Sequence, residues 1–230
     1  LPIFCTIAIS ILSGSIAERM RFFPFMIFIF IWVLVIYSPV AHWVWGGGWI
    51  QQLGALDYAG GTVVHITSGI SGLVLAIMIG SGKKVEKIKP HNLLIALIGG
   101  ILVWMGWYGF NTGSAFAFNS VALTSFINTV IAASGGAFGW LVFEYIITKK
   151  LSLLGLLSGV LAGLVTITPA AGYVTTLSAY IISIVGGIFC YIVINHIKEK
   201  YKYNDTLDAF GIHGVGGIIG AILTGIFQSH

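Results

Sequence analysis

The chain has 230 residues, of which 57% are hydrophobic and only 8% are charged. Soluble domains carry roughly 25% charged residues, so this composition, with a mean hydropathy of +1.00, excludes a soluble globular protein and predicts a multi-pass membrane protein. The net charge is +4, but the basic residues lie in short clusters. That pattern excludes a nucleic-acid-binding surface and fits contact with anionic lipid.

The basic residues predict how the chain crosses the membrane. All eleven fall into four clusters, namely Arg19 and Arg21; Lys83, Lys84, Lys87 and Lys89; Lys149 and Lys150; and Lys198, Lys200 and Lys202. Each interval between clusters is long enough for two membrane helices of ~20 residues and a turn. Each hairpin is therefore expected to return to the side it left, which the positive-inside rule identifies as the cytoplasm.

The apolar runs between these clusters predict eight helices, in chain order 1–17, 23–44, 60–80, 92–110, 120–146, 152–168, 175–197 and 209–228. Trp43, Trp45 and Trp49 crowd one turn on the side opposite the basic clusters, as aromatic rings do at a membrane boundary. The predicted fold class is an all-α polytopic transmembrane helix bundle, with residues 1–230 as a single transmembrane domain. Because the chain begins at Leu1 without Met or a charged leader, we expect a fragment of a longer protein.

Two histidines lie inside apolar segments in the same frame. His65 and His213 each begin His-x-x-x-Gly-x-x-Gly, and an Asp stands upstream of each, Asp57 and Asp208 respectively. An ionisable side chain within a membrane is costly and usually faces a bundle interior or a pathway. The two histidines lie five predicted helices apart, so their helices run in opposite directions, as an inverted repeat requires.

Each of these residues has a structural interpretation beside the functional one. A single buried His is usually a core residue that bonds a neighbouring carbonyl, whereas the repeated frame favours a shared pathway. The rings meet only if both helices begin deep in the membrane. Asp57 is expected to cap the third helix or, as an exposed carboxylate, to favour a cation at an outer vestibule. Asp208 is expected to cap the last helix.

Six stretches closely resemble the ammonium transporter (Amt/Mep/Rh) family. They are Ala-Glu-Arg-Met-Arg-Phe (17–22), Trp-Gly-Gly-Gly (45–48), Gly-Ala-Leu-Asp-Tyr-Ala-Gly-Gly-Thr-Val-Val-His (54–65), Lys-Pro-His-Asn (89–92), Gly-Trp-Tyr-Gly-Phe-Asn-Thr-Gly-Ser (106–114) and Asp-Ala-Phe-Gly-Ile-His-Gly-Val-Gly-Gly (208–217). The resemblance covers nearly the whole chain in order. It implies an eleven-helix fold built as a five-plus-five inverted repeat, of which this chain covers about the third to the tenth helix, so that the N- and C-terminal helices are missing.

By position, the resemblance implies a role for four residues around the substrate. Trp45 and Ser114 are implied to form the outer ammonium recruitment site. An indole face binds a small cation by roughly 0.5–2 kcal/mol, and the Ser114 hydroxyl is able to accept a hydrogen bond from a bound N–H. Phe4 and Phe110 are implied to be paired rings that gate the pathway below that site.

The resemblance also implies that His65 and His213 line a hydrophobic path and that Asp57 is a structural or deprotonation-linked acid. The implied function is transport: ammonium is recruited, loses a proton and crosses as ammonia, with or without that proton. The chain is thus expected to be no enzyme and to need no cofactor or metal. The implied partners are the lipid bilayer, two further copies in a homotrimer, and a PII-type signal protein at the cytoplasmic face of the cell membrane.

Two alternatives to transport stay open from the sequence. A membrane ammonium sensor would keep the same site but signal instead of conducting. A b-type haem electron carrier would use two buried histidines as axial ligands. The lack of a second histidine pair speaks against the haem protein.

Overall fold

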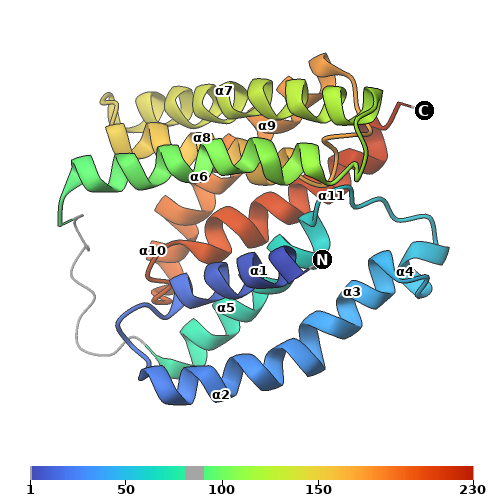
Figure 1. Ribbon diagram of the computed structural model, residues 1–230. Helices are drawn as coiled ribbons and strands as arrows, with labels where there is room; N and C mark the ends of the chain where they lie inside the picture. The colour runs from blue at the N-terminus through green and yellow to red at the C-terminus, as the bar shows by residue number, and fades with distance from the viewer. Residues whose placement is uncertain (1, 81–90, 230) are drawn as a thin grey trace.

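The computed structural model describes residues 2–80 and 91–229, and every named element within them is helical (Figure 1). In chain order these elements are α1 (Pro2–Ser15), α2 (Phe22–Trp32), the π-helical turn η1 (Val33–Tyr37), α3 (Ser38–Trp45), α4 (Trp49–Gln52), η2 (Gly61–Ile66), α5 (Thr67–Ile79), α6 (Leu93–Gly113), α7 (Ser120–Thr148), α8 (Leu153–Ile167), α9 (Thr176–Ile192), η3 (Val193–Ile197), α10 (Lys198–Tyr201), η4 (Phe210–Gly214) and α11 (Val215–Phe227). The π-helical turns continue into their neighbouring helices, so eight long helical segments result. They confirm the eight predicted spans to within four residues at each end, and the short α4 is additional.

Six of these segments are long and apolar enough to cross a membrane, which makes the chain an integral membrane protein. α1 has 14 residues and α8 has 15, fewer than the ~20 residues of a full span. The short α8 is largely buried among α6, α7 and α9, and the chain beyond Ile167 continues as buried turns. Irregular backbone at membrane depth is tolerated there because protein shields it from lipid.

Side-chain caps fix where several helices begin. Asn92, Asn119, Ser152 and Thr175 each accept a hydrogen bond from a backbone N–H in the first turn of α6, α7, α8 and α9 respectively. These residue types satisfy N–H groups that have no partner within the helix. The helix starts therefore follow from local sequence.

The basic clusters of the described residues lie at one end of the bundle. They occupy the turns that follow α1 and α7, and α10 with the turn after it, which lie at the left in Figure 1, whereas α4, the α6–α7 connection and the C-terminus lie at the right. The fourth cluster, Lys83 to Lys89, lies outside the described residues. We name these ends the basic end and the opposite end. That the basic end faces the cytoplasm stays a prediction.

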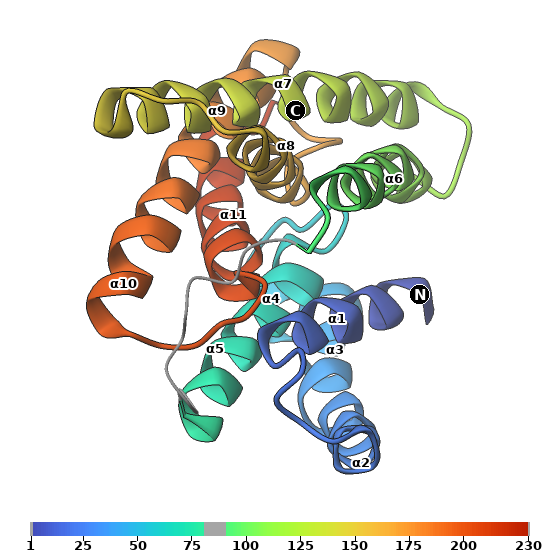
Figure 2. The same cartoon turned by 90° about the vertical axis from the view of Figure 1, so that its left-hand side faces the viewer.

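The same order of elements occurs twice along the chain. Each time, a short helix comes first, then a segment with a central π-helical turn, and then a segment that begins with such a turn. These elements are α1, α2–η1–α3 and η2–α5 in the first group, and α8, α9–η3–α10 and η4–α11 in the second. Figure 2 shows α1, α2 and α3 below, α7, α8 and α9 above, and α11 between them. α11 packs against η2 and α5 packs against η4, a reciprocal contact that fits an inverted repeat.

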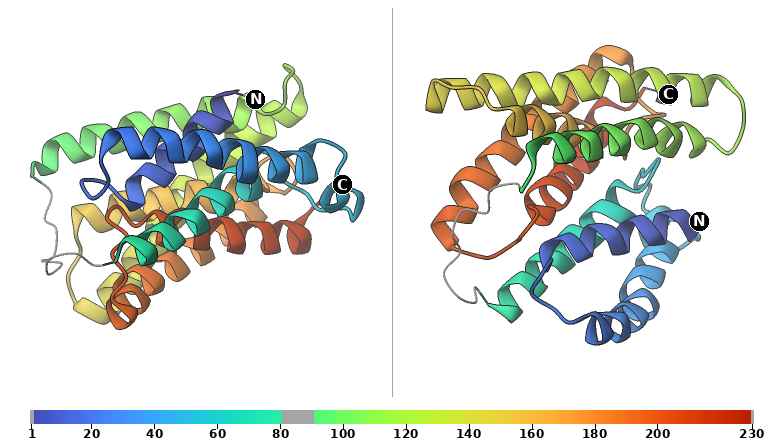
Figure 3. Two further views of the ribbon diagram at one scale, coloured as in Figure 1. Left: turned by 90° about the horizontal axis from the view of Figure 1, so that it is seen from below. Right: turned by 60° about the vertical axis from the view of Figure 1, so that its left-hand side comes forward.

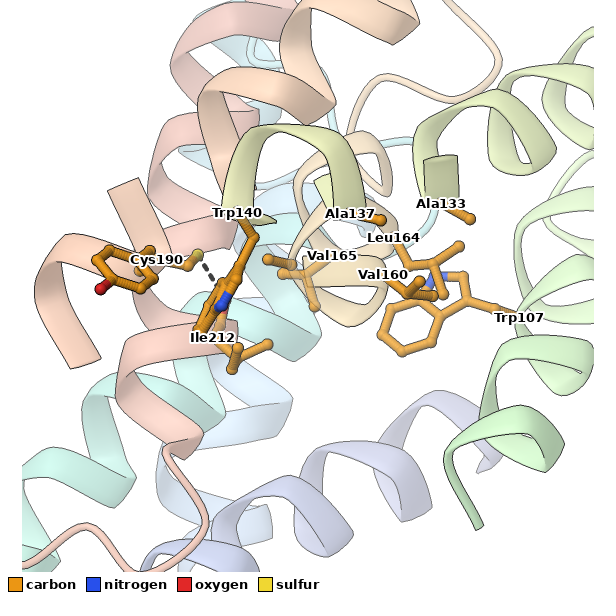
Figure 4. Packing of buried hydrophobic residues seen from close by; sticks show 11 residues of the cluster. Trp107, Ala133, Ala137, Trp140, Val160, Leu164, Val165, Cys190 and Ile212 are labelled. Atoms are coloured by element: carbon orange, nitrogen blue, oxygen red, sulfur yellow. Dashed lines mark hydrogen bonds between the residues drawn. The ribbon is translucent and has the colours of Figure 1, made fainter. Parts of the chain in front are cut away.

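Helix α6 connects the two groups of elements. It runs beside α7 along one face of the bundle, as Figure 3 shows, while α1 and α2 run along another. A core cluster fills the space between α6 and its neighbours (Figure 4), with Trp107 at one end, Cys190 at the other, and Val160, Leu164 and Val165 between Trp107 and Trp140. Trp107 thereby lies where the core borders the site described next.

Candidate functional site

His65 and His213 touch each other inside the bundle. Their Nδ1 atoms lie 3.2 Å apart, and their rings stack with centroids 5.1 Å apart at 25°. One Nδ1 carries a proton and donates it into a hydrogen bond that the other Nδ1 accepts, with the tautomer setting which is the donor. The buried Nε2 of His65 has no hydrogen-bond partner among the described residues. It is free to bond a small polar molecule, whereas the ring contact leaves no room for a haem iron between the histidines.

The repeated glycines explain why the rings can meet. Gly69 follows His65 by four residues and faces the backbone of Gly214 so closely that a Cβ there would overlap it. Gly217 follows the other histidine by four residues, and a Cβ there would lie 2.8 Å from the carbonyl oxygen of Gly61. Each helical segment thus begins where the other crosses it. Both helices therefore start inside the bundle, and that the start lies deep in the membrane stays a prediction.

Asp57 holds the start of the first histidine segment. Its Oδ1 accepts hydrogen bonds from the N–H groups of Gly60 (2.9 Å) and Gly61 (2.7 Å), and its Oδ2 from those of Thr62 (2.8 Å) and Val63 (3.0 Å). Burial raises the pKa of the Asp57 carboxyl, and these four bonds counteract the shift. Asp57 therefore lies in the predicted cap. The alternative of an exposed carboxylate is wrong, because the residue is only 7% exposed.

The expectation that Asp208 caps the last helix is also wrong. Asp205 does so instead, since its two carboxylate oxygens accept the first N–H groups of the η4 segment at 3.0 and 2.7 Å. Asp208 pairs with Lys198, whose Nζ lies 2.6 Å from its Oδ1. Asp205 precedes its histidine by eight residues, as Asp57 does. This equal spacing is the sequence signal that could have identified Asp205 as the cap.

The predicted aromatic residues form a continuous series that ends at the histidines. The ring of Trp45 lies 5.2 Å from that of Phe4, Phe4 lies 4.9 Å from Phe110, and Phe110 lies 6.3 Å from His65. The Trp45 indole N–H donates to the carbonyl oxygen of Asp57 at 2.8 Å. The outermost ring is thus fixed to the loop that caps the first histidine segment.

Ser114 stands one helical turn beyond Phe110, where α6 ends. Its hydroxyl donates to the Phe110 carbonyl oxygen at 2.8 Å, which leaves the hydroxyl oxygen able to accept a further hydrogen bond. Within residues 2–80 and 91–229, no hydrogen bond or ring contact joins Ser114 to Trp45 directly. The structure connects the two through Phe110 and Phe4.

Trp107 is a site residue to which the sequence analysis gave no role. Its ring is nearly parallel to that of His65 (17°, centroids 5.3 Å apart) and to that of His213 (9°, 6.4 Å). It also meets Phe110 edge-on at 6.0 Å. The signal that could have found it is its position three residues before Phe110, which puts both rings on one face of α6.

A cavity of about 480 Å³ runs along the histidine pair. It is lined by Ile7, Ser10, Ile11, Gly14, His65, Val103, Gly106, Trp107, Phe110, Leu161, Leu207, Ala209 and His213. Apart from the two imidazoles and the Ser10 hydroxyl, every lining side chain is apolar or an indole. Such a cavity disfavours a bare cation, because little in it replaces the ion's water.

A sequence profile of the Ammonium Transporter Family matches residues 2–230. The chain belongs to the ammonium transporter family. It is 54% identical to an ammonium transporter of Bacillus subtilis (strain 168) over 98% of this chain and 56% of that protein. The crystal structure of Saccharomyces cerevisiae Mep2 matches with a TM-score of 0.92 and 42% identity, over 98% of this chain and 53% of that one.

A structure titled "Sensor Amt Protein" also matches this family member, with a TM-score of 0.92 and 35% identity, over 99% of this chain and 60% of that one. The chain spans about half the length of the relatives that it matches. The comparisons confirm the predicted family and the all-helical membrane fold.

Proposed function

We propose that this chain carries the ammonium pathway of a transporter and that the path follows the aromatic series to the histidine pair. Ammonium is recruited at Trp45 and Ser114, passes the Phe4–Phe110 pair and loses a proton, and ammonia crosses along His65 and His213. The observation that carries this proposal is the contact of the two imidazoles inside an otherwise apolar cavity.

The chemistry of the lining supports deprotonation before passage. Moving a charged ammonium ion into apolar surroundings costs several kcal/mol or more, whereas neutral ammonia needs only a hydrogen-bond partner. The unpartnered His65 Nε2 offers that partner. Potassium donates no hydrogen bond and has no proton to lose, so the same path selects against it.

Two substitutions test the path. His65→Ala and His213→Ala, each in the full-length gene product reconstituted into proteoliposomes, are expected to lower ammonium flux at least tenfold or to admit potassium. The reason is that each removes one partner of the only imidazole pair in the cavity. Ammonium and potassium pulses on a solid supported membrane measure both. His196→Ala is the matched control, because His196 lies outside the cavity and packs against Tyr191.

The outcomes separate transport from signalling. If both histidine variants kept the flux and the selectivity of the parent, the pathway assignment would be wrong. A parent that gave neither a current nor a change in vesicle pH, yet bound ammonium, would be a sensor. The likeness to the sensor structure favours keeping this second candidate.

Three further expectations rest on the family and stay predictions. They are the homotrimer, the PII-type protein docked at the basic end, and the cell membrane as the location. Whether the proton crosses with ammonia is decided by the same current measurement, because neutral ammonia alone carries no charge.

A further inference from the structure

We propose that Thr168 is a positioning residue for the histidine pair, because its hydroxyl fixes the indole plane of Trp107 parallel to both imidazoles. The inference rests on the proposed function for its effect on transport. Its structural part stands on the hydrogen bond between α6 and the end of α8. Nothing in the sequence indicated it, since Thr168 lies in a turn about 60 residues from Trp107.

The Thr168 hydroxyl that accepts this hydrogen bond is itself held in place by a second one. The Trp107 indole N–H donates to Thr168 Oγ1 at 3.0 Å, and Oγ1 donates its own proton to the Leu164 carbonyl oxygen at 2.7 Å. Asn111 Oδ1 stands farther away, at 3.5 Å. Thr168 is fully buried, so no water competes for this oxygen. A threonine hydroxyl has one proton, so with that proton donated to Leu164 its oxygen acts as the acceptor for the Trp107 N–H.

The indoles of this bundle differ in whether they have such a partner. Trp104 and Trp140 have no hydrogen-bond partner for Nε1 among the described residues, whereas Trp32 donates to Ser71 Oγ and Trp45 to the Asp57 carbonyl oxygen. A buried N–H without a partner costs free energy. The partner at Trp107 matters for the site because this indole stacks on both histidines.

The bond has two consequences for the cavity. It fixes the rotation of the indole, and the ring then stands within 17° of His65 and 9° of His213. It also directs the indole N–H toward Thr168, which does not line the cavity. Only the ring of Trp107 then faces the path. Without Thr168 Oγ1, the unpaired N–H gains by turning toward an imidazole nitrogen, which alters the hydrogen bonding of the pair.

Thr168→Val tests this arrangement because it keeps the shape and removes the oxygen. The matched control is Thr224→Val, since Thr224 is equally buried and its hydroxyl likewise donates to the carbonyl four residues earlier, at 2.7 Å. Thr168→Ser restores the oxygen. Each variant is made in the full-length gene product, and two properties are measured: ammonium flux in proteoliposomes and the ¹⁵N resonances of the imidazoles in histidine-labelled protein.

We expect Thr168→Val to lower the maximal ammonium flux about five- to tenfold, the effect of one lost buried hydrogen bond on a barrier. The half-saturating concentration changes by less than about twofold, because recruitment at Trp45 is untouched. The ¹⁵N resonances of both histidines shift. Thr168→Ser returns both properties to the parent, and Thr224→Val leaves both unchanged.

Three outcomes would overturn the inference. They are histidine resonances in Thr168→Val that match those of Thr224→Val, a flux of Thr168→Val equal to that of a parent that transports, and a Thr168→Ser variant that behaves like Thr168→Val. If Thr168→Val did not fold, Trp107→Phe would serve, since it removes the indole N–H. The inference then requires that Trp107→Phe lowers the flux and shifts the ¹⁵N resonances of both histidines. A parent that does not transport refutes the proposed function alone, because the ¹⁵N resonances still test the hydrogen bond.

Discussion

The two helix starts that present the histidines have the same geometry but are stabilised differently. At the opposite end, the Asp57 carboxylate is met by four backbone N–H groups. At the basic end, Asp205 accepts two such bonds and lies near cationic side chains, Lys198 and Arg19. One end is therefore closed by the backbone itself, and the other by side chains that depend on charge.

The side chains at the basic end connect separate segments. The Arg19 guanidinium donates to the carbonyl oxygens of Ser15 and Gly80 at 2.8 Å and also to that of Asn204. The Lys198 ammonium donates to the Asp205 carbonyl oxygen at 2.6 Å. The loop before η4 is held in place from two sides. Because one cap consists of four backbone bonds and the other of two backbone bonds with added side-chain contacts, the two ends should respond differently to substitution.

The largest difference is expected when each capping carboxylate becomes an amide. Asp57→Asn removes one acceptor oxygen that serves two N–H groups, at about 1.5 kcal/mol each, whereas Asp205→Asn removes one that serves a single N–H group. The expected losses in unfolding free energy are about 3 and about 1.5 kcal/mol. For a chain of this size they correspond to about 9 °C and about 4 °C in Tm.

Thermal unfolding of the two purified variants in detergent measures this difference. Equal losses, or a larger loss for Asp205→Asn, would show that the number of backbone bonds does not set the stability of these caps. Asp208→Asn serves as the control. The Asp208 carboxylate lies in the same loop as Asp205, but it accepts a hydrogen bond from Lys198 and caps no helix.

A smaller difference is expected between the two crossing glycines. A Cβ on Gly69 would overlap the backbone nitrogen of Gly214, whereas the nearest backbone atom to a Cβ on Gly217, the Gly61 carbonyl oxygen, is farther away at 2.8 Å. We expect Gly69→Ala to cost about 2 kcal/mol and Gly217→Ala about 1 kcal/mol. The control is Gly225→Ala, where a Cβ meets nothing within 4 Å.

Tm again measures the change, and Gly225→Ala should raise it slightly, because alanine favours a helix interior over glycine. If Gly69→Ala were as well tolerated as Gly225→Ala, the helix crossing would be looser than the structure indicates.

The helices and their directions could be predicted from the sequence because their determinants are local. Apolar length sets each span and clustered lysines set the turns, while asparagine, serine and threonine caps set several starts. The π-helical turns could not be predicted, since a mostly apolar segment such as Val33–Tyr37 has no polar periodicity in which an added residue would show. α4 was missed because four residues after a glycine turn carry too little periodicity.

The site was predictable only in part. The histidine frame and the aromatic residues stand out in the sequence, but which side chains complete the site depends on tertiary contacts. Asp208 lies nearer to its histidine than Asp205 does, yet the loop turns Asp208 toward Lys198 and Asp205 toward the helix start. Trp107 and Thr168 meet only because α6 packs against the end of α8.

The smallest effect is expected from the cation at the basic end. Lys198→Met removes a partly exposed ion pair with Asp208, with side-chain exposures of 22% and 33%, and such pairs contribute about 1 kcal/mol at most. Lys200→Met is the control, since Lys200 lies two residues away beside the ring of Tyr201. The dependence of this effect on pH is more informative than its size.

Burial raises the folded-state pKa of Asp208, and Lys198 lowers it in part. A carboxyl with a raised folded pKa contributes stability below its unfolded pKa of about 4 and loses that contribution as the pH rises through the folded value. Without Lys198 the folded pKa rises further, so the variant loses more than the parent does on going to higher pH. The difference in Tm between parent and Lys198→Met should therefore be larger at about pH 8 than at about pH 3, below the unfolded pKa. A difference that is the same at both values would mean that Lys198 stabilises the loop through its bond to the Asp205 carbonyl alone, and that charge plays no part at this end.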